Sequence, residues 1–233
     1  MVRRRTGPDA TPDIEHLGED GLLLRLGSRI DPAVNARVHA IARRLDASRP
    51  PWVRDIVPAY ASLAVFVDVG HGTDMTRLLD NATAWLRVEA LDADGRGDVV
   101  AARLVEIAVR YGGADGPDLE ALAAHAGLDA AEVVARHAAV EYTVAMLGFA
   151  PGFPYLLGLD PSLAMARLDT PRTRVPAGSV GIGGAQTGIY PHPGPGGWRI
   201  LGRTEAVLFD SRRDPPSLLC AGDRVRFVPI ATP

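Results

Sequence analysis

Polar side chains that could bind a small molecule are concentrated in one Gly- and Pro-rich stretch, residues 148–204. The candidates for lining a site there are Arg172, Arg174, Ser179, Gln186, Thr187, Tyr190, His192, Arg203 and Thr204. A glutamine amide donates and accepts hydrogen bonds at once, which suits recognition of an amide such as a lactam or a urea. Because neither Gln186 nor Tyr190 is a nucleophile at neutral pH, we expect both to bind or polarise a ligand.

Two of these candidates, Arg172 and Arg174, stand two residues apart in the segment PRTRVP. On an extended strand they project to the same side, where two guanidinium groups could clamp a carboxylate or a carbonyl oxygen. The alternative is a pair of exposed arginines that form ion pairs with Asp160 or Asp169. Arg203 lies near the end of the stretch and could add a further cation.

The glycines of segment 178–184, GSVGIGG, fit neither of two familiar motifs. The nucleophile elbow needs Gly-x-Ser-x-Gly, but Gly178 directly precedes Ser179. The dinucleotide fingerprint needs a third glycine where Gln186 stands, and no helix is predicted to follow. We therefore expect these glycines to let the backbone approach a ligand closely or to turn a tight barrel corner.

The remaining titratable residues form no recognisable catalytic set. His137 stands four residues before Glu141, so it either forms a proton relay with that carboxylate or interacts with a helix C-terminus. His192 lies between two prolines, which favours a surface loop, and Asp115 and Asp118 are typical of turns and helix caps. No set of His, Cys or carboxylate residues has the spacing of metal ligands, so we predict no protein-bound metal.

Composition excludes several classes of function. All 25 basic residues among the 233 are arginine, and the net charge is −3. The arginines form no basic stripe with interleaved aromatic residues, so we expect no binding to nucleic acid. Because the chain lacks lysine, it has neither the P-loop lysine that contacts nucleotide phosphates nor a Schiff-base residue. If the protein uses ATP, we expect another polypeptide to bind it.

Cysteine content and hydropathy indicate the cellular compartment. The single Cys220 cannot form an internal disulfide, and its neighbours Leu218 and Leu219 predict a buried thiol. No segment reaches the ~18–20 apolar residues of a membrane span. The basic N-terminus is not followed by the apolar region of a signal peptide. We therefore expect a cytoplasmic protein without membrane contact.

Hydrophobic periodicity predicts an α+β fold in two domains. We expect a flexible N-terminus at residues 1–12, a small α+β domain at 13–92 and a β-barrel domain at 99–233. The polar, Gly-containing segment 92–98 is typical of a domain boundary. In the first domain we predict strands at 14–17, 22–26, 53–57 and 63–67, a helix at 32–47, and a second helix capped by Thr73 or Asp74.

The second domain contains short strands with irregular connections, as in a closed barrel. We predict strands at 102–110, 142–147, 206–209 and 223–230, and helices at 117–127 and 130–139. The Gly- and Pro-rich stretch carries many large apolar side chains, and their exposure to water would be costly. It is therefore expected to form short strands and turns around a pocket, with Phe149, Phe153 and Tyr155 mostly in the core.

The same stretch resembles a known protein family through long contiguous motifs. Residues 148–160 match the pattern GFxPGFPYLxGLD, and residues 171–204 match PRxxVPAGSVGIxGxQTGIYPxxxPGGWxxxGRT. Weaker resemblance at 56–68, 109–123 and 221–230 extends the match over nearly the whole chain except its first dozen residues. The motifs are similar to those of the KipI/PxpB family, also called allophanate-hydrolase subunit 1, which includes the B-type subunit of the ATP-dependent 5-oxoprolinase.

The resemblance implies a cyclophilin-like β-barrel after the small α+β domain. It also implies opening of 5-oxo-L-proline to L-glutamate with ATP, in a complex with a homologous C-type subunit and with a structurally different A-type subunit. The chain would then supply part of a composite site, which fits its lack of a complete catalytic constellation. Substrate-binding residues would come from Arg172, Arg174, Ser179, Gln186, Thr187, Tyr190 and Arg203.

Other functions stay open at this point. Some members of the family inhibit a sporulation histidine kinase, so the fold could serve a regulatory binding protein. Related domains occur in urea-processing enzymes, which favours a urea- or allophanate-related carboxyltransferase component, but those domains lie within much longer chains. A prolyl isomerase role has the least support, because we find no match to the catalytic motif of cyclophilins.

Overall fold

The computed structural model describes residues 13–68, 74–92 and 102–231. The chain divides into two compact units, Met1–Val100 and Ala101–Pro233, each with its own hydrophobic core. The predicted N-terminal segment 1–12 and nearly all of the predicted boundary segment 92–98 lie outside the described residues. The fold is mixed α+β with a closed barrel, as the sequence predicts. No helix in the described ranges combines the length and the apolar character needed to cross a membrane.

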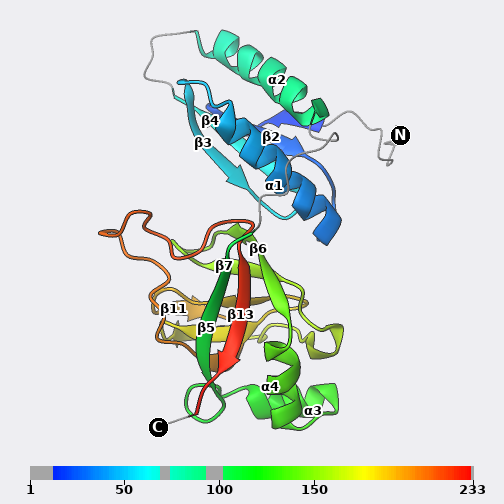
Figure 1. Ribbon diagram of the computed structural model, residues 1–233, viewed down its shortest axis with the longest axis vertical. Coiled ribbons are helices and arrows are strands. Elements are labelled where there is room, and N and C mark those ends of the chain that lie inside the picture. Colours follow the sequence, from blue (N-terminus) through cyan, green and yellow to red (C-terminus); the bar gives the residue numbers. More distant parts are fainter. Residues whose placement is uncertain (1–12, 69–73, 93–101, 232–233) are drawn as a thin grey trace. The chain divides into compact units, whose positions relative to one another are not determined.

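The first unit is a twisted antiparallel sheet covered on one face by two helices (Figure 1). The sheet has the order β1-β2-β4-β3, formed by β1 (Asp13–His16), β2 (Gly21–Arg25), β3 (Val53–Pro58) and β4 (Ser62–Val67). The helices are α1 (Pro32–Ala47) and α2 (Met75–Asp92). Alternating residues of the strands meet the apolar face of both helices in a core that includes Leu22, Leu24, Val38, Ile41, Leu63, Val65 and Leu86.

Acidic caps begin both helices of this unit. The Asp31 carboxylate accepts hydrogen bonds from the backbone N–H groups of Ala33 at 2.7 Å and Val34 at 3.1 Å. Asp74 accepts one from Thr76 at 3.0 Å. Such caps satisfy N–H groups that have no partner within the helix. Asp31 thus caps α1, which begins where the sequence predicts a helix, and of the two candidates for α2 it is Asp74 that the structure places in this role.

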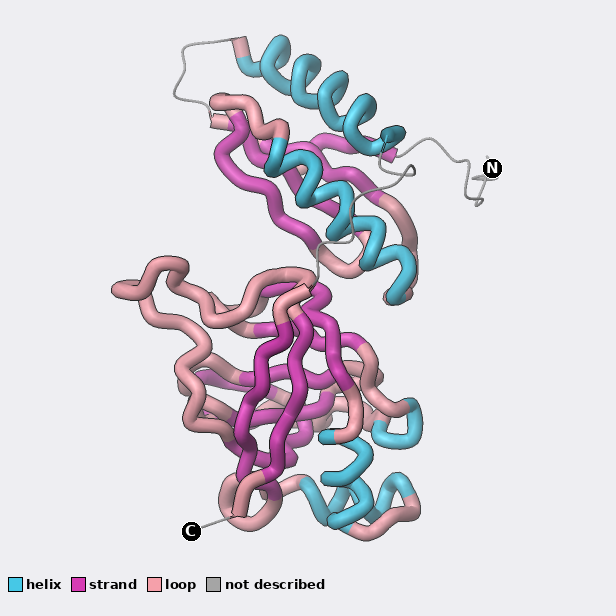
Figure 2. Tube along the Cα trace, in the orientation of Figure 1, coloured by secondary structure: helices cyan, strands magenta, loops and turns pink. Residues whose placement is uncertain are grey.

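The second unit is a closed barrel with the strand order β10-β7-β6-β13-β5-β12-β9 (Figure 2). Its strands are β5 (Leu104–Tyr111), β6 (Glu141–Leu147), β7 (Pro154–Leu157), β9 (Ser179–Ile182), β10 (Thr187–Ile189), β12 (Arg199–Arg203) and β13 (Arg224–Pro229). All neighbours are antiparallel except β5 and β13, which run parallel. A separate antiparallel pair is formed by β8 (Arg172–Val175) and β11 (Gly194–Gly196). The Gly- and Pro-rich stretch therefore forms short strands, as predicted.

Two short helices, α3 (Leu119–Ala126) and α4 (Ala130–Ala138), lie together at one end of the barrel (Figure 2). Helix α3 ends at Gly127, which adopts the left-handed conformation with φ of 67°. Helix α4 begins at Asp129, whose side chain accepts from the Glu132 N–H at 2.7 Å. Both ends agree with the sequence predictions.

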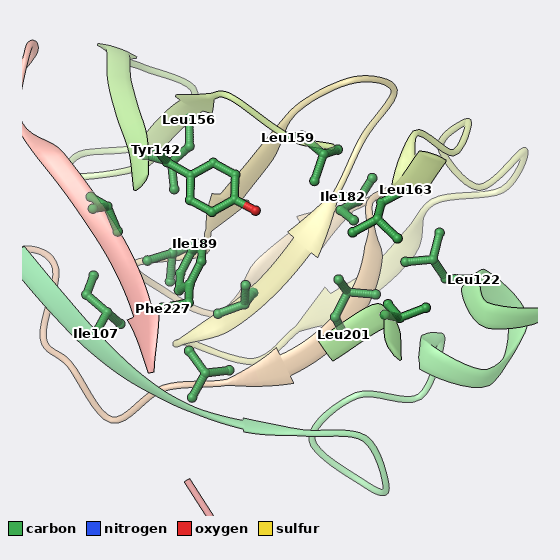
Figure 3. Close-up of a cluster of buried hydrophobic side chains, with 14 of the residues drawn as sticks. Ile107, Leu122, Tyr142, Leu156, Leu159, Leu163, Ile182, Ile189, Leu201 and Phe227 are labelled. Atoms are coloured by element: carbon green, nitrogen blue, oxygen red, sulfur yellow. The ribbon is translucent and has the colours of Figure 1, made fainter. Parts of the chain in front are cut away.

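Large apolar side chains fill the barrel interior, so it is a packed core and not a channel (Figure 3). Tyr142 and Phe227 lie against one another in the centre, with ring centroids 5.4 Å apart. Aliphatic side chains surround them from most strands and from α3, including Ile107, Leu122, Leu156, Leu163, Ile182, Ile189 and Leu201. Any ligand site of this unit must therefore lie at the surface of the barrel or in its loops.

The segment before β13 differs from the sequence prediction. Residues 206–209 form no regular strand and contribute only an isolated bridge between Phe209 and Ser217. The segment instead closes a local loop with residues 213–218: the Arg213 guanidinium donates to the carbonyl groups of Val207 and Leu208, and the Leu208 carbonyl also accepts from the Leu218 N–H at 2.8 Å. Cys220 is exposed, so its predicted burial is wrong, because the buried member of the run is Leu219.

Candidate functional site

A small pocket of about 70 Å³ opens in the second unit, where the loop after β5 meets β8, β9 and β12. Three of the predicted site residues line it, namely Arg172, Ser179 and Arg203. The rest of the lining consists of Ala114, Asp115, Pro117, Val175, Pro176 and Ile200. The volume is small beside the ~300–1,000 Å³ of pockets that enclose drug-sized ligands. It suits one polar group of a small molecule and not a nucleotide.

Strand register brings the polar residues of this pocket together. Arg203 on β12 lies directly opposite Ser179 on β9 and directly opposite Arg110 on β5. Directly opposed residues have their Cβ atoms roughly 4.5–5.5 Å apart and point to the same face of the sheet. Barrel closure therefore assembles a cluster whose members are far apart in the sequence.

Asp118 fixes Arg172 at the pocket wall. Its buried carboxylate accepts one hydrogen bond from the Arg172 guanidinium at 2.8 Å and another from the Ile200 N–H at 2.6 Å. Arg172 also donates to the Trp198 carbonyl oxygen at 3.3 Å. Arg172 therefore forms its ion pair with Asp118 and not with Asp160 or Asp169, the partners of the alternative prediction. The Asp160 side chain instead accepts from the Ser162 N–H.

The predicted capping role of Asp118 is also corrected. It stands at the first position before α3, yet its side chain makes no capping hydrogen bond to that helix. Both of its oxygens are directed to β8 and β12, which follow much later in the chain. A local sequence pattern cannot distinguish these two uses of an aspartate before a helix, so the partnership with Arg172 was missed.

Arg110 is the second pocket-side arginine that has acidic partners. It forms ion pairs with Asp115, 3.0 Å from Nε, and with Glu205, 2.9 Å from Nη1. The hydrogen bonds that Arg110 donates to Asp115 and, second, to Glu205 raise its pKa above the ordinary value. Sequence analysis did not single out Arg110, since only the barrel register places it opposite Arg203.

Arg203 has a different environment. Its Nε donates to the Ala177 carbonyl oxygen at 2.9 Å. Within the described part of the chain, its two terminal nitrogens make no hydrogen bond and no carboxylate lies within ion-pair distance. Ser179, its cross-strand neighbour, is buried and lines the same pocket. A guanidinium fork and a hydroxyl donor are the groups that bind a carboxylate or an oxyanion.

Four other candidates lie outside the pocket lining. Arg174 is exposed on β8. Gln186 lies in the turn between β9 and β10, where its main-chain carbonyl oxygen accepts from the Gly183 N–H. His192 is exposed in a loop, as predicted. Thr204 is buried, and its hydroxyl oxygen accepts from the Ala206 N–H at 3.1 Å. The proposed clamp of two arginines thus has only Arg172 at the pocket.

Tyr190 belongs to a buried aromatic cluster. Its ring meets that of Phe153 with centroids 5.2 Å apart, and Phe153 in turn meets Trp198 at 5.4 Å. Burial raises the pKa of the Tyr190 phenol. Phe153 is in the core as predicted, whereas Phe149 is 66% exposed. We therefore assign Tyr190 a packing role in the aromatic cluster with Phe153 and Trp198.

The glycines of segment 178–184 let the chain approach itself. A Cβ atom on Gly178, where φ is +78°, would lie 2.0 Å from the Thr204 carbonyl oxygen. A Cβ atom on Gly183 would lie 2.6 Å from the ring of Trp198. Both distances are too short for any side chain. Of the two predicted roles, tight barrel packing accounts for these glycines without a ligand.

Thr187 is part of a buried hydrogen-bonded chain that runs through the barrel core. The Tyr111 hydroxyl lies 2.8 Å from His137 Nδ1, and His137 Nε2 lies 3.0 Å from the Thr187 hydroxyl. Thr187 donates its one hydrogen to the Gly181 carbonyl oxygen at 3.0 Å. It must therefore accept from Nε2–H, which leaves Nδ1 to accept from Tyr111. This assignment makes the imidazole neutral and uses the donor capacity of Thr187 fully.

His137 lies in the last turn of α4, as predicted, but the predicted proton relay with Glu141 is wrong. The side chain makes no pair with Glu141, which instead binds Arg224 and Arg226. It points into the core and stacks on Phe227 with ring centroids 4.7 Å apart. Burial lowers the pKa of His137 to about 3. Across the described ranges, no group of three or more His, Cys, Asp or Glu side chains is arranged to hold a metal ion.

Comparison with known proteins identifies the class. The family model "Carboxyltransferase domain, subdomain C and D" matches residues 12–219. The B-type 5-oxoprolinase subunit of Bacillus subtilis (strain 168) is 41% identical over 227 residues, which cover 94% of this chain and 92% of the relative. That of Escherichia coli O157:H7 is 43% identical over 213 residues, 91% of this chain and 94% of the relative. The fold is thus of the carboxyltransferase-domain class, and the chain belongs to the KipI/PxpB family, which contains these B-type 5-oxoprolinase subunits.

Solved structures include longer proteins with the same fold. TTHA0988 superposes with a TM-score of 0.74 at 39% identity, covering 92% of this chain and 40% of that chain. The urea amidolyase of K. lactis gives a TM-score of 0.74 at 21% identity, covering 97% of this chain and 15% of that one. At the latter identity the likeness concerns the fold alone. This chain spans less than half the length of either protein.

The Asp118 bridge predicts a measurable contribution to stability. Asp118→Ala leaves the Arg172 guanidinium and the Ile200 N–H without their acceptor, so we expect the free energy of unfolding to fall by about 1–3 kcal/mol. Asp118→Asn keeps one acceptor oxygen and should cost less. Urea unfolding measures both, with Asp169→Ala, an exposed aspartate, as the control within about 0.5 kcal/mol of wild type. Equal losses for Asp118→Ala and Asp169→Ala would contradict the bridge.

The buried His137 predicts loss of stability in mild acid. Its pKa falls from 6.5 to about 3 on folding, so the unfolded chain binds more protons below pH 6.5. The free energy of unfolding therefore decreases as the pH falls, by about 2 kcal/mol between pH 8 and pH 5 from this group. Urea unfolding over this pH range should show a shallower dependence in His137→Gln, whereas the exposed His192→Gln should match wild type. An unchanged slope in His137→Gln contradicts the assignment.

Proposed function

We propose that this chain is the B-type subunit of an ATP-dependent 5-oxoprolinase and contributes part of a composite site that opens 5-oxo-L-proline to L-glutamate. The observation that carries the proposal is the pocket where Arg172, Ser179 and Arg203 converge. Relatives named as 5-oxoprolinase subunits of this type, 41% and 43% identical over nearly their whole length, support it. The substrate is a small molecule with one carboxylate and one cyclic amide, and the pocket offers cationic and hydroxyl donors to one of these polar groups.

The chemistry of ring opening explains the need for such donors. A planar lactam resists attack by water, and negative charge develops on the carbonyl oxygen as the nucleophile adds to the carbonyl carbon, before the C–N bond breaks and the ring nitrogen takes up a proton. Donors fixed in advance stabilise that oxygen in the transition state, often by more than any other single contribution. ATP would supply the activation of the carbonyl group, and since the chain has no lysine, we propose that the nucleotide is held by a partner protein of the complex.

The pocket is incomplete as a catalytic site within the described residues. Ser179 has no histidine beside it, and the fully buried His137 is enclosed by Tyr111 and Thr187. Ser179 therefore lacks the general base that activates a serine nucleophile. We propose that a homologous C-type subunit, together with an A-type subunit, supplies the missing groups, since the relatives are themselves named as subunits of an enzyme.

An exposed apolar feature favours a second candidate function, that of a regulatory binding protein. Phe149 and Val207 are 66% and 60% exposed, and they lie on loops that touch where Gly152 meets Leu208 and Phe209. Exposed apolar groups that gather at one place are typical of protein-binding surfaces. A histidine kinase is the partner we would test. The likeness to urea amidolyase concerns the fold alone and gives a urea-related carboxyl transfer less support.

Reconstitution tests the proposed function. We expect ATP hydrolysis that depends on 5-oxo-L-proline in a mixture of this chain with candidate A-type and C-type subunits, and none when any one of them is omitted. The reason is that no single chain is proposed to hold all the reacting groups. Coupled spectrophotometric detection of ADP, with glutamate measured in parallel, provides the readout.

Two results would contradict this function. Full activity without this chain would show that it is dispensable for the reaction. Absence of activity in every mixture of folded subunits would move support to the regulatory candidate, for which saturable binding to a histidine kinase is the next measurement.

A further inference from the structure

The guanidinium groups of Arg172 and Arg203 line the pocket, and Arg110 is the cross-strand neighbour of Arg203 on β5. Arg172 is paired with Asp118 at 2.8 Å. Arg110 is paired with both Asp115 and Glu205. A guanidinium that already binds a carboxylate has fewer donors and less net charge to offer an anion. These two arginines are therefore poor candidates for binding a charged substrate group.

Arg203 has a different set of contacts. Its Nε donates to the backbone carbonyl oxygen of Ala177, and no carboxylate in the described ranges lies within ion-pair distance of its guanidinium group. Its cross-strand neighbour on β5, Arg110, binds Asp115 and Glu205, so these two carboxylates are engaged by Arg110 and not by Arg203.

The acidic groups of the cluster do not cancel the charge of Arg203. Asp115 lines the pocket, but its carboxylate is held by Arg110. The second partner of Arg110, Glu205, has a side chain that is 81% exposed, so water screens its charge. The two terminal nitrogens of Arg203 thus form a fork of the shape that binds a carboxylate with two parallel hydrogen bonds.

We infer that Arg203 is the residue that binds the carboxylate of the substrate, with Ser179, directly opposite on β9, as a second donor. This inference rests on the proposed function and specifies how its site recognises 5-oxo-L-proline. Arg172 then serves as a wall of the pocket, fixed by Asp118. The carboxylate keeps its charge while the ring opens, so Arg203 binds the ground state and the transition state equally.

Equal binding in both states determines the kinetic signature. Loss of such a contact raises KM and leaves kcat unchanged. In the reconstituted enzyme we expect Arg203→Gln to raise KM for 5-oxo-L-proline about tenfold to hundredfold, the range for a lost hydrogen bond to a charged group, with kcat retained. Arg203→Lys keeps the charge without the fork and should give an intermediate KM.

The same strand provides a matched control. Arg199 also lies on β12 and is half-buried, and its Nε likewise donates to a backbone carbonyl, that of Ala166 at 3.2 Å. It does not line the pocket. Arg199→Gln should therefore leave KM and kcat at wild-type values. Equal changes in KM for Arg199→Gln and Arg203→Gln would overturn the inference.

Stability separates a binding role from a structural one. Arg203→Gln loses the hydrogen bond from Nε to the Ala177 carbonyl oxygen, so we expect its Tm to fall no further than that of Arg199→Gln, which loses the equivalent bond to Ala166. A large fall in Tm would show that Arg203 mainly supports the fold and would overturn the inference. If Arg203→Gln does not fold, Arg203→Lys gives the kinetic test, and an unchanged KM in that variant counts against the carboxylate fork.

Direct binding distinguishes failure of this inference from failure of the proposed function. Calorimetry on the full chain compares 5-oxo-L-proline with 2-pyrrolidinone, the same lactam without a carboxylate. We expect wild type to prefer 5-oxo-L-proline and Arg203→Gln to lose that preference. An Arg203-dependent preference without ATP hydrolysis in any mixture would refute the proposed function but not the role of Arg203. ATP hydrolysis with an unchanged KM in Arg203→Gln would refute the role of Arg203 in binding the carboxylate but not the proposed function.

Discussion

The buried carboxylate of Asp118 is the contact on which the pocket depends. One of its oxygens binds the Arg172 guanidinium of β8, and the other binds the backbone of Ile200 on β12. At 7% exposure this carboxylate needs such partners, because a buried polar group without hydrogen bonds is strongly unfavourable. The start of α3, strand β8 and strand β12 are thereby held in one arrangement, and the space between them is the pocket.

Barrel closure adds the second constraint. Strand β12 pairs with β9 on one side and β5 on the other, so Arg203 has a serine and an arginine as its lateral neighbours. Arg110 binds two carboxylates, whereas within the described residues the Arg203 guanidinium donates only to the Ala177 carbonyl oxygen. A cation that is available for an anion can cost stability and provide affinity, as expected where function and stability compete. The interior of the barrel is filled and its polar chain through His137 is satisfied, so we assign ligand binding to the surface.

Local signals in the sequence predicted much of the fold. The caps at Asp31 and Asp129 and the left-handed Gly127 determine helix ends through contacts within a few residues, which a sequence displays directly. Apolar alternation likewise predicted β4 and β13. The segment 206–209 was predicted wrongly because its contacts go to the nearby residues 213–218, and its apolar residues alone do not distinguish such a loop from a barrel strand.

The site was harder to predict, because its contacts join distant segments. The sequence nominated Arg172, Ser179 and Arg203, yet it equally nominated Thr187 and Tyr190, which the structure places in the core. Gly183 and Gly178 attracted attention as possible ligand contacts and instead accommodate Trp198 and Thr204. The roles of Asp118, Arg110 and His137 depend on strand register and burial, which only the folded barrel supplies.

The most direct measurement is a crystal structure of the assembled enzyme with 5-oxo-L-proline bound. We predict that the substrate carboxylate lies roughly 2.7–2.9 Å from the terminal nitrogens of Arg203, and that the lactam ring of the substrate is directed to a partner protein of the complex. A substrate whose carboxylate is bound by another cation, or one that lies away from the pocket between β8, β9 and β12, would contradict it.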